Sequence, residues 1–558
     1  MSILATTAAS KAAVSGLVPY AGPWGREQAA HLLRRTLFGP KKAEISESVN
    51  LGLGGTLDQL LSTPRQPSPP LNHFFSGDSN VPVGQSWINA PHGSGFDVGR
   101  YRNPSLRGWF WQNLLHHDFN IMARMTMFWV NHFGIADIEE QRAEYQSIQL
   151  FNEFGTDNFQ RMIERVTVNT GMLIFLNGQY SNRWDPNENY GRELLELFTI
   201  QRGPQVSLGD YTYYTEEDIP PIARILTGWR IRGMWSNTIG DLESWFDESW
   251  HDPDPKQLSH RFDNVVINNT ENPEEEYKEL IQLIFKKAQT AKSFCEQLYR
   301  FFVYFDITEE VDVEVIDPLA QVLIDNNYDI KPTLRALFSS QHFYDISVRG
   351  PLIKSPYDFV ASMARPLGGF SHLDLDLSDN SENNPLLRSC YSLGFAHHER
   401  AYNMGMSFLD PPSVAGWKAY YQEPVYYRTW IGSSTLKHRK ALVDDYTGDG
   451  IETETENEFD FEARPFDYFG FVASLEAPSD PNELVAESAQ IFLPRELHPD
   501  QLDALKRELT AGLADEEWVR QYEDYLANPF NSDVVNPVLN KLKNFFRALF
   551  SMAEFHLM

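Results

Sequence analysis

PNENYGRELLELF, residues 186–198, is the stretch that decides the fold class of this chain. With about 100° between successive residues of a helix, Leu194, Leu195 and Phe198 fall on one side of it. The other side carries polar side chains close to one another, namely Asn189, Arg192, Glu193 and Glu196. The stretch therefore predicts an amphipathic helix that packs on one face and holds an arginine between two carboxylates on the other.

The polar face of this helix has two interpretations. In the first it is a solvated stripe, and Arg192 forms an ordinary i,i+4 pair with Glu196 that contributes only about 0.3–0.5 kcal/mol. In the second the stripe faces a polar cavity, where a carboxylate could act as acid or base. Periodicity does not distinguish the two, and the sequence discloses no reaction.

Other parts of the chain repeat the same helical pattern, with apolar residues at a spacing near 3.6 and breakers between the segments. The segments are residues 24–36, 106–133, 145–176, 274–287, 291–302, 317–326 and 333–340. Few stretches alternate with period two. The sequence therefore predicts a mainly α-helical protein with little or no sheet.

We expect residues 1–24 to form an N-terminal arm and residues 25–558 to form one large helical domain. Polar or irregular stretches interrupt the helical pattern near residues 63–104, 232–273, 371–386 and 443–463. The last of these is strongly acidic, and its self-repulsion predicts a flexible, solvated loop. The longest stretch, residues 63–104, is long enough that a role in function is expected for it.

Composition narrows the classes of partner. The formal net charge of −30, from 77 acidic and 47 basic residues, repels phosphate backbones and disfavours nucleic acid as a partner. The sequence contains no run of 18 apolar residues, so it predicts no membrane span. Two cysteines 95 positions apart, Cys295 and Cys390, form no disulfide framework or CxxC site. The motifs of elbow-type serine hydrolases, P-loop enzymes and Rossmann dehydrogenases are absent as well.

Three further segments carry candidate site residues. Asn131 and His132 end the apolar segment MTMFWVNHFG, where a lone histidine is more often a hydrogen-bonded core residue than a ligand. Arg224 leaves the packing face of TEEDIPPIARILTGW and could clamp Glu193, Glu196 or a ligand. The turn HDPDPK gathers His251, Asp252 and Lys256, and it suits either a polar pocket or plain surface.

Taken together, these segments resemble the bacterial domain-of-unknown-function family 1800 from about Gly25 to the C-terminus. The segments that carry the resemblance are HLLRRTLFGP, MTMFWVNHFG, PNENYGRELLELF, YTEEDIPPIARILTGW, HDPDPK, IKSPYDFV and DPPSVAGWKAYYQEPVYYRTWI. The resemblance implies a helical protein, often exported, whose members are frequently encoded beside a sulfatase-like companion of domain-of-unknown-function family 1501. That pairing implies a shared extracytoplasmic task, for which polysaccharide is the expected substrate.

The chain departs from the family pattern in ways that affect metal binding and export. Relatives frequently carry histidine at the positions of Val130 and Phe198, so a metal site built on those histidines is in doubt here. Residues 169–173 replace the Asp-Pro-Ala-Met-Leu of relatives, which removes a carboxylate. The N-terminus lacks a basic region followed by a continuous apolar core, so export through a typical signal is not predicted.

The leading functional hypothesis is one polar cavity that acts on carbohydrate. Its catalytic candidates are Glu193, Glu196, His251 and Asp252, and its binding candidates are Asn131, His132, Asn189, Arg192, Arg224, Trp229 and Lys256. Sugar rings could stack on loop aromatics, namely Trp235, Trp245, Trp250, Tyr420, Tyr421, Tyr426 and Tyr427. The alternatives are a non-catalytic assembly protein that works with the sulfatase-like companion, and a metalloprotein. No cofactor is assigned.

Overall fold

The computed structural model describes residues 15–92, 98–368, 387–421, 426–454 and 461–558. The fold is mainly α-helical, as the sequence predicts. Strands within the described residues pair into four two-stranded antiparallel sheets. None of the described helices is long and apolar enough to cross a bilayer.

The elements are as follows. The first third of the chain contains α1 (Arg26–Thr36), α2 (Lys42–Leu60), α3 (Gly99–Leu115), α4 (Met122–Phe133), α5 (Gln141–Phe154), α6 (Phe159–Thr167), α7 (Thr170–Phe175) and α8 (Glu188–Glu196). The middle contains α9 (Ile219–Ile225), α10 (Glu276–Phe285), α11 (Ala288–Phe302), α12 (Glu309–Val311), α13 (Asp317–Asp325), α14 (Ile330–Phe338) and α15 (Pro356–Ala364). The last part contains α16 (Leu387–Asn403), α17 (Lys418–Tyr421), α18 (Ser433–Thr447), α19 (Tyr468–Ala473), α20 (Pro481–Phe492), α21 (Pro499–Thr510), α22 (Asp515–Ala527) and α23 (Ser532–Ser551).

The strands are short. They are β1 (Gln205–Ser207), β2 (Asp210–Tyr211), β3 (Trp229–Arg232), β4 (Glu243–Phe246), β5 (Lys256–Gln257), β6 (Val266–Ile267), β7 (Ile451–Glu454) and β8 (Phe461–Arg464). In the longest hairpins, Trp229 pairs with Phe246 and Ile451 pairs with Arg464. These hairpins are separate two-stranded sheets attached to the helical body, and they do not form a central sheet.

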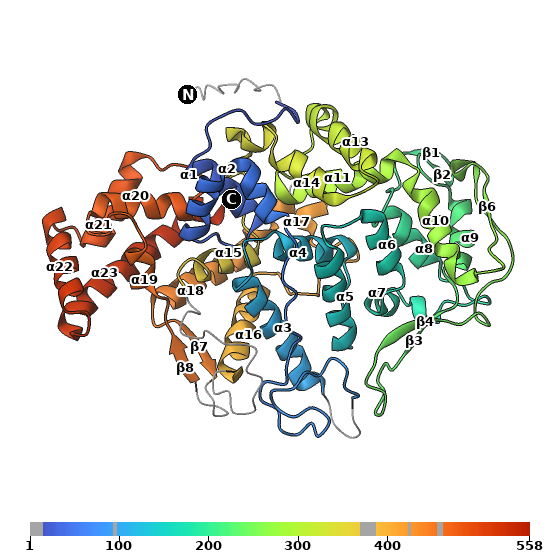
Figure 1. Cartoon of the computed structure of the whole chain (residues 1–558), viewed down its shortest axis with the longest axis horizontal. Coiled ribbons are helices and arrows are strands. Elements are labelled where there is room, and N and C mark those ends of the chain that lie inside the picture. The colour runs from blue at the N-terminus through green and yellow to red at the C-terminus, as the bar shows by residue number, and fades with distance from the viewer. Residues whose placement is uncertain (1–14, 93–97, 369–386, 422–425, 455–460) are drawn as a thin grey trace, which may run out of the picture.

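The molecule is elongated, and chain order follows its long axis only in part (Figure 1). Helices α20 to α23 occupy one end, and α6, α8, α10 and the hairpins β1–β2 and β3–β4 occupy the other. Helices α3, α4, α15 and α16 lie between them. The centre is therefore built from segments that are far apart in sequence.

Two glycines allow a close helix crossing at this centre. A Cβ atom on Gly108 of α3 would meet the backbone of Tyr391, and one on Gly394 of α16 would meet the backbone of Gly108. Because neither glycine has a side chain, α3 and α16 approach backbone to backbone. This contact brings the C-terminal half of the chain onto the helix that will line both cavities described below.

The structure gives α8 the packing that its sequence predicts. Leu194, Leu195 and Phe198 are at most 2 % exposed and belong to the core. The helix begins after Asn187, whose side chain accepts a hydrogen bond from the Tyr190 amide and caps it. The apolar stripe and the cap together fix which way the polar stripe faces.

The four segments expected to interrupt the helical pattern differ from one another in the described structure. Residues 232–273 form most of the hairpins β3–β4 and β5–β6 with their connections, and residues 63–92 are irregular. Within residues 443–454 and 461–463, α18 extends to Thr447 and β7 pairs with β8, so this part is more regular than a solvated loop. Residues 371–386 lie outside the described residues. Both cysteines are buried free thiols.

The described end of the N-terminal arm is tied to the body. The Tyr20 amide donates to Ser339 O at 2.8 Å, and Val18 O accepts from the Gln341 amide at 2.7 Å. The C-terminal residues pair similarly, with Met558 donating to Leu352 O at 2.9 Å. Both ends of the described chain therefore pack on the segment that follows α14.

Candidate functional site

Arg192 of the predicted polar stripe binds a carboxylate outside its own helix. Its two terminal nitrogens donate to the two carboxylate oxygens of Glu216, at 2.9 and 2.8 Å. Glu196, the predicted i,i+4 partner, lies farther off at 3.7 Å and accepts a hydrogen bond from the Tyr214 hydroxyl. A bidentate pair is stronger and more directional than a single contact, so Glu216 decides the orientation of Arg192.

Glu193 is the free carboxylate of this stripe. It is half-buried, and within the described residues its side chain has no hydrogen-bond partner. Burial raises the pKa of Glu193 above its ordinary value, and the neighbouring Glu196 adds to the effect. Asn189, in contrast, is exposed.

The HDPDPK turn forms a bidentate ion pair with Arg224 through Asp252. Arg224 donates from Nε and Nη2 to the two carboxylate oxygens of Asp252, at 2.7 and 2.8 Å. Burial raises the pKa of Asp252, but the hydrogen bonds from Arg224 outweigh it and hold that pKa below the ordinary value. Arg224 therefore pairs with Asp252, 28 residues later in the chain. The sequence had suggested Glu193 or Glu196 as its partner.

A buried charge cluster lies directly behind this clamp. Lys256 Nζ donates to Glu276 Oε2 at 2.6 Å and to the Asp252 carbonyl at 2.6 Å. His251 Nε2 lies 3.1 Å from the same Glu276 oxygen. Lys256, Glu276 and His251 are each at most 2 % exposed. The cluster is closed to solvent, and its contacts are those of a structural ion pair.

His132 is a core histidine. Its Nδ1 lies 2.6 Å from Gln297 Oε1 and its Nε2 lies 3.3 Å from Phe198 O. Burial lowers the pKa of His132 to about 4, so its ring is neutral at pH 7. The neighbouring Asn131 accepts from the Trp417 amide at 2.8 Å.

That last contact joins two of the sequence segments singled out above. Gly416, with φ +81°, lies so close to Asn131 that a Cβ atom would meet its backbone and side-chain oxygens. Gly134 packs in the same way on the backbone of Val414. The asparagine and the glycines of MTMFWVNHFG and DPPSVAGW therefore serve a backbone docking contact.

The aromatic candidates separate by exposure. Trp229 packs edge-on against Phe246 and Tyr277. Trp235 and Trp245 are more than two-fifths exposed. Trp250 and Tyr420 are half-buried. The side chains of Tyr421, Tyr426 and Tyr427 lie outside the described part of the chain.

The predicted site residues thus fall into three networks, centred on Arg192, on Arg224 with Lys256, and on His132. Their contacts do not join them in one hydrogen-bond network, because Arg192, Lys256 and His132 each bind a partner that sequence reasoning missed. The missed partners are Glu216, Glu276 and Gln297. Within the described residues, no group of three or more His, Cys, Asp or Glu could hold a metal ion.

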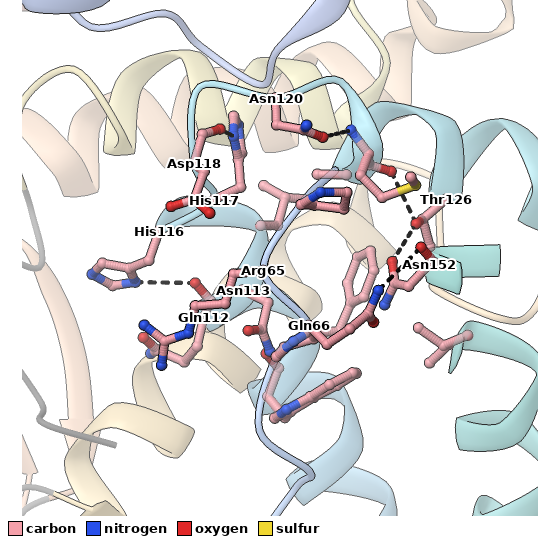
Figure 2. Close-up of a pocket in the computed structure, with 18 of the residues that line it drawn as sticks. Arg65, Gln66, Gln112, Asn113, His116, His117, Asp118, Asn120, Thr126 and Asn152 are labelled. Atoms are coloured by element: carbon pink, nitrogen blue, oxygen red, sulfur yellow. Dashed lines mark hydrogen bonds between the residues drawn. The ribbon is translucent and has the colours of Figure 1, made fainter. Parts of the chain in front are cut away.

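A pocket of about 330 Å³ lies elsewhere, between α3, α4, α5 and the segment that follows α2 (Figure 2). We call it the amide pocket, because five of its side chains are amides. These are Gln66, Gln112, Asn113, Asn120 and Asn152. The apolar part of its lining includes Trp109, Phe110, Leu114, Met122, Ala123 and Ile148.

In several of these amides, only one of the two polar atoms is hydrogen-bonded to the protein among the described residues. Asn113 Nδ2 donates to Trp109 O at 2.7 Å, and Gln112 Nε2 donates to Cys390 O at 2.5 Å. Asn152 Oδ1 accepts from the Thr126 hydroxyl at 2.6 Å. Among the described residues, the other ends have no partner, which leaves Asn113 Oδ1 and Gln112 Oε1 as acceptors and Asn152 Nδ2 as a donor. The pocket therefore presents fixed donors and acceptors.

Charged groups stand at the edge of the amide pocket. Arg65, His116 and Asp118 line it and are exposed. His117 Nδ1 lies 2.6 Å from Asp118 O, while its Nε2 is buried without a partner. Burial lowers the pKa of His117 well below its ordinary value, and Arg365 adds to this. The interior of the pocket is therefore polar but uncharged at neutral pH.

Sequence reasoning had little chance of finding this pocket. Its amides come from α3, α5 and two connecting segments, and neutral amides at such spacing match no motif. The one available signal was the long polar stretch near residues 63–104, which supplies residues 64–68 of the wall. In the neighbouring pair, His116 Nδ1 lies 3.0 Å from Gln112 O and His117 Nδ1 lies 2.6 Å from Asp118 O.

Known proteins offer one point of comparison. No curated protein and no solved structure matches this chain. The family described as "Protein of unknown function (DUF1800)" matches residues 31–557, nearly the whole chain. The motifs that carry the sequence resemblance lie inside that range, and the chain belongs to this family.

Proposed function

We propose that the amide pocket binds a neutral carbohydrate unit. The observation that carries the proposal is the set of half-tied amides, in which Asn113 and Gln112 present acceptors and Asn152 presents a donor. A sugar hydroxyl both donates and accepts, so it can satisfy fixed acceptors and a fixed donor together. Because their other ends are already bonded, these amides lose little conformational freedom when a ligand arrives.

Size and charge support the same ligand class. The volume of about 330 Å³ lies at the small end of the range of ligand pockets, about 300–1,000 Å³. The interior carries no charged group at neutral pH, so it gives an ionic ligand no counter-charge to offset the cost of leaving water. Apolar side chains beside the amides suit the C–H faces of a sugar ring.

The test is binding of a panel of neutral mono- and disaccharides to the full chain, measured by saturation-transfer NMR and calorimetry. Asn113→Ala removes one acceptor on α3 and should weaken the bound saccharide about three- to tenfold. Asn540→Ala makes the same change on the exposed face of α23 and should leave binding unchanged. Absence of saccharide binding, or equal affinities for the two variants, would refute the proposal.

A second candidate function is assembly with a partner protein, for which the resemblance implies the sulfatase-like companion of family 1501. It is favoured by an exposed arginine–tryptophan surface. Trp184 is 66 % exposed, with the Arg183 guanidinium 4.4 Å from its ring centre. Trp250 lies beside it, and Arg230 stacks on Trp250 at 3.8 Å. Tryptophan and arginine dominate the binding energy of protein interfaces.

Co-purification with that companion tests the second candidate. Trp184→Ala should weaken the complex at least tenfold if this surface is the centre of the interface. Leu208→Ala, at a residue that is 98 % exposed on the β1–β2 hairpin, serves as the control. A complex that survives Trp184→Ala, or no complex at all, would remove this candidate.

A further inference from the structure

A second and larger cavity, of about 960 Å³, opens on the other side of α3. We call it the acidic cavity. It is lined by α3, α5 and α16, by the segment between α4 and α5, and by His92, Trp235, Ser407, Leu409 and Asp410. Its carboxylates are Asp137, Glu139, Glu144, Glu399 and Asp410, and its guanidiniums are Arg100 and Arg107.

Four of these carboxylates are unpaired. Asp137, Glu139, Glu399 and Asp410 are exposed on the cavity wall, and none of them forms an ion pair with a described residue. Arg107 does not offset them, because both ends of its guanidinium bind Glu144, at 2.6 and 2.9 Å. With only Arg100 left as an unpaired cation, the free groups of the wall leave a surplus of three negative charges.

A buried acceptor without a partner points to a ligand that donates hydrogen bonds. Gln141 lines the cavity, is only 5 % exposed and donates through Nε2 to Glu139 O at 3.1 Å. Its Oε1 is buried and has no hydrogen-bond partner. Leaving a buried acceptor without a donor is unfavourable. A donor that reaches Gln141 Oε1 from the cavity would satisfy it.

Exposed aromatic rings complete the wall. Trp235 is 46 % exposed and Tyr402 is 60 % exposed, and both line the cavity. The Trp235 ring lies 5.0 Å from that of His92, which in turn lies 2.9 Å from Glu140. The face of an aromatic ring attracts an ammonium group, and the carboxylates of the same wall attract it as well.

We propose that the acidic cavity binds a linear polyamine, an aliphatic chain that carries two or three ammonium groups. The unpaired carboxylates come from separate elements and do not gather around one point, so they match several charges spread along a chain better than a single metal ion. Ammonium groups supply the donors that the carboxylates and Gln141 lack, and the methylene segments lie against the aromatic rings. This site is independent of the amide pocket.

Calorimetric titration of the full chain with spermidine and putrescine tests the inference. We expect saturable binding, stronger for spermidine because it carries one charge more. We expect the affinity to fall as the salt concentration rises. Glu139→Gln and Asp410→Asn should each weaken spermidine about fivefold. These side chains are exposed, so both variants should remain folded.

A matched control separates a specific site from general attraction to an acidic protein. Glu523→Gln on α22 removes one exposed charge far from α3 in sequence and should leave spermidine affinity unchanged. Equal losses in Glu523→Gln and Glu139→Gln would overturn the inference, as would no binding of spermidine at millimolar concentration. Displacement of spermidine by an equal concentration of MgCl2 would overturn it as well.

Discussion

At the scale of single residues, the predicted polar groups differ mainly in how far they are removed from water. Glu276 is 2 % exposed and lies against Lys256 and His251, whereas the Glu216 side chain is 40 % exposed and pairs with Arg192. Breaking a buried ion pair leaves a charge without compensation. Breaking an exposed pair returns both partners to water. The same chemistry therefore has very different consequences at the two sites.

The first prediction concerns Glu276→Gln. It leaves Lys256 and His251 buried without a carboxylate, so the free energy of unfolding should fall by about 3–5 kcal/mol. Glu216→Gln is the matched control and should cost less than about 1 kcal/mol. Urea denaturation followed by circular dichroism measures both. Similar losses in the two variants would contradict the assignment of Glu276 to a buried structural pair.

The second prediction concerns pH. The pKa of His132 is about 4 in the folded chain against 6.5 for an unperturbed histidine, so the unfolded chain binds a proton first as the pH falls. Stability is therefore fully present above pH 6.5 and declines until the pH reaches the folded pKa. At pH 5 this one residue should account for about 2 kcal/mol of the loss.

The measurement is the free energy of unfolding at pH 7.5 and at pH 5 for the native chain and for His132→Gln. The substitution should reduce the difference between the two pH values by about 2 kcal/mol. The pH dependence that remains in His132→Gln should come from other buried histidines with lowered pKa values, such as His73 and His397. An unchanged pH dependence would show that His132 is protonated alike in both states.

At the scale of elements, the fold depends on places where backbones meet without side chains. The crossing of α3 with α16 and the docking of Gly416 on Asn131 are both of this kind. The sequence predicts the helices themselves because their apolar stripes are local. It predicts neither contact, since a glycine in a sequence does not reveal which distant backbone it touches.

The third prediction compares two glycines with similar backbone angles. Gly416 has φ +81° and touches Asn131, whereas Gly512 has φ +73° and has nothing within 4 Å of a built Cβ atom. Alanine at Gly512 should cost only the backbone strain, about 1–2 kcal/mol. Alanine at Gly416 adds a clash with backbone and should cost at least about 2 kcal/mol more. Equal costs in thermal denaturation would contradict the docking contact.

At the scale of the whole molecule, the net charge of −30 acts on the folded state. Like charges repel in the compact chain, and the Debye length falls from about 30 Å at 0.01 M salt to about 10 Å at 0.1 M. Exposed ion pairs such as Arg520 with Asp524 would lose stability in the same range, but each contributes little. The repulsion should therefore dominate the response to salt.

The fourth prediction is that the melting temperature rises by several degrees between 0.01 and 0.1 M NaCl. Tetramethylammonium chloride at equal ionic strength should give the same rise, because screening does not depend on the identity of the cation. Differential scanning calorimetry measures both series. A fall in melting temperature would mean that attractive pairs outweigh the repulsion.

The sequence by itself determined the mainly helical fold, the packed face of α8 and the family of the chain, because apolar periodicity and motif order are local properties. It identified charged residues of the right kind, such as Arg192, Arg224 and Lys256, but not their partners. Only the tertiary structure decided that Glu216, Asp252 and Glu276 satisfy them. Only the tertiary structure assembled the two cavities. A hydrogen-bond partner and a cavity wall are set by distance in space, and segments far apart along the chain supply them.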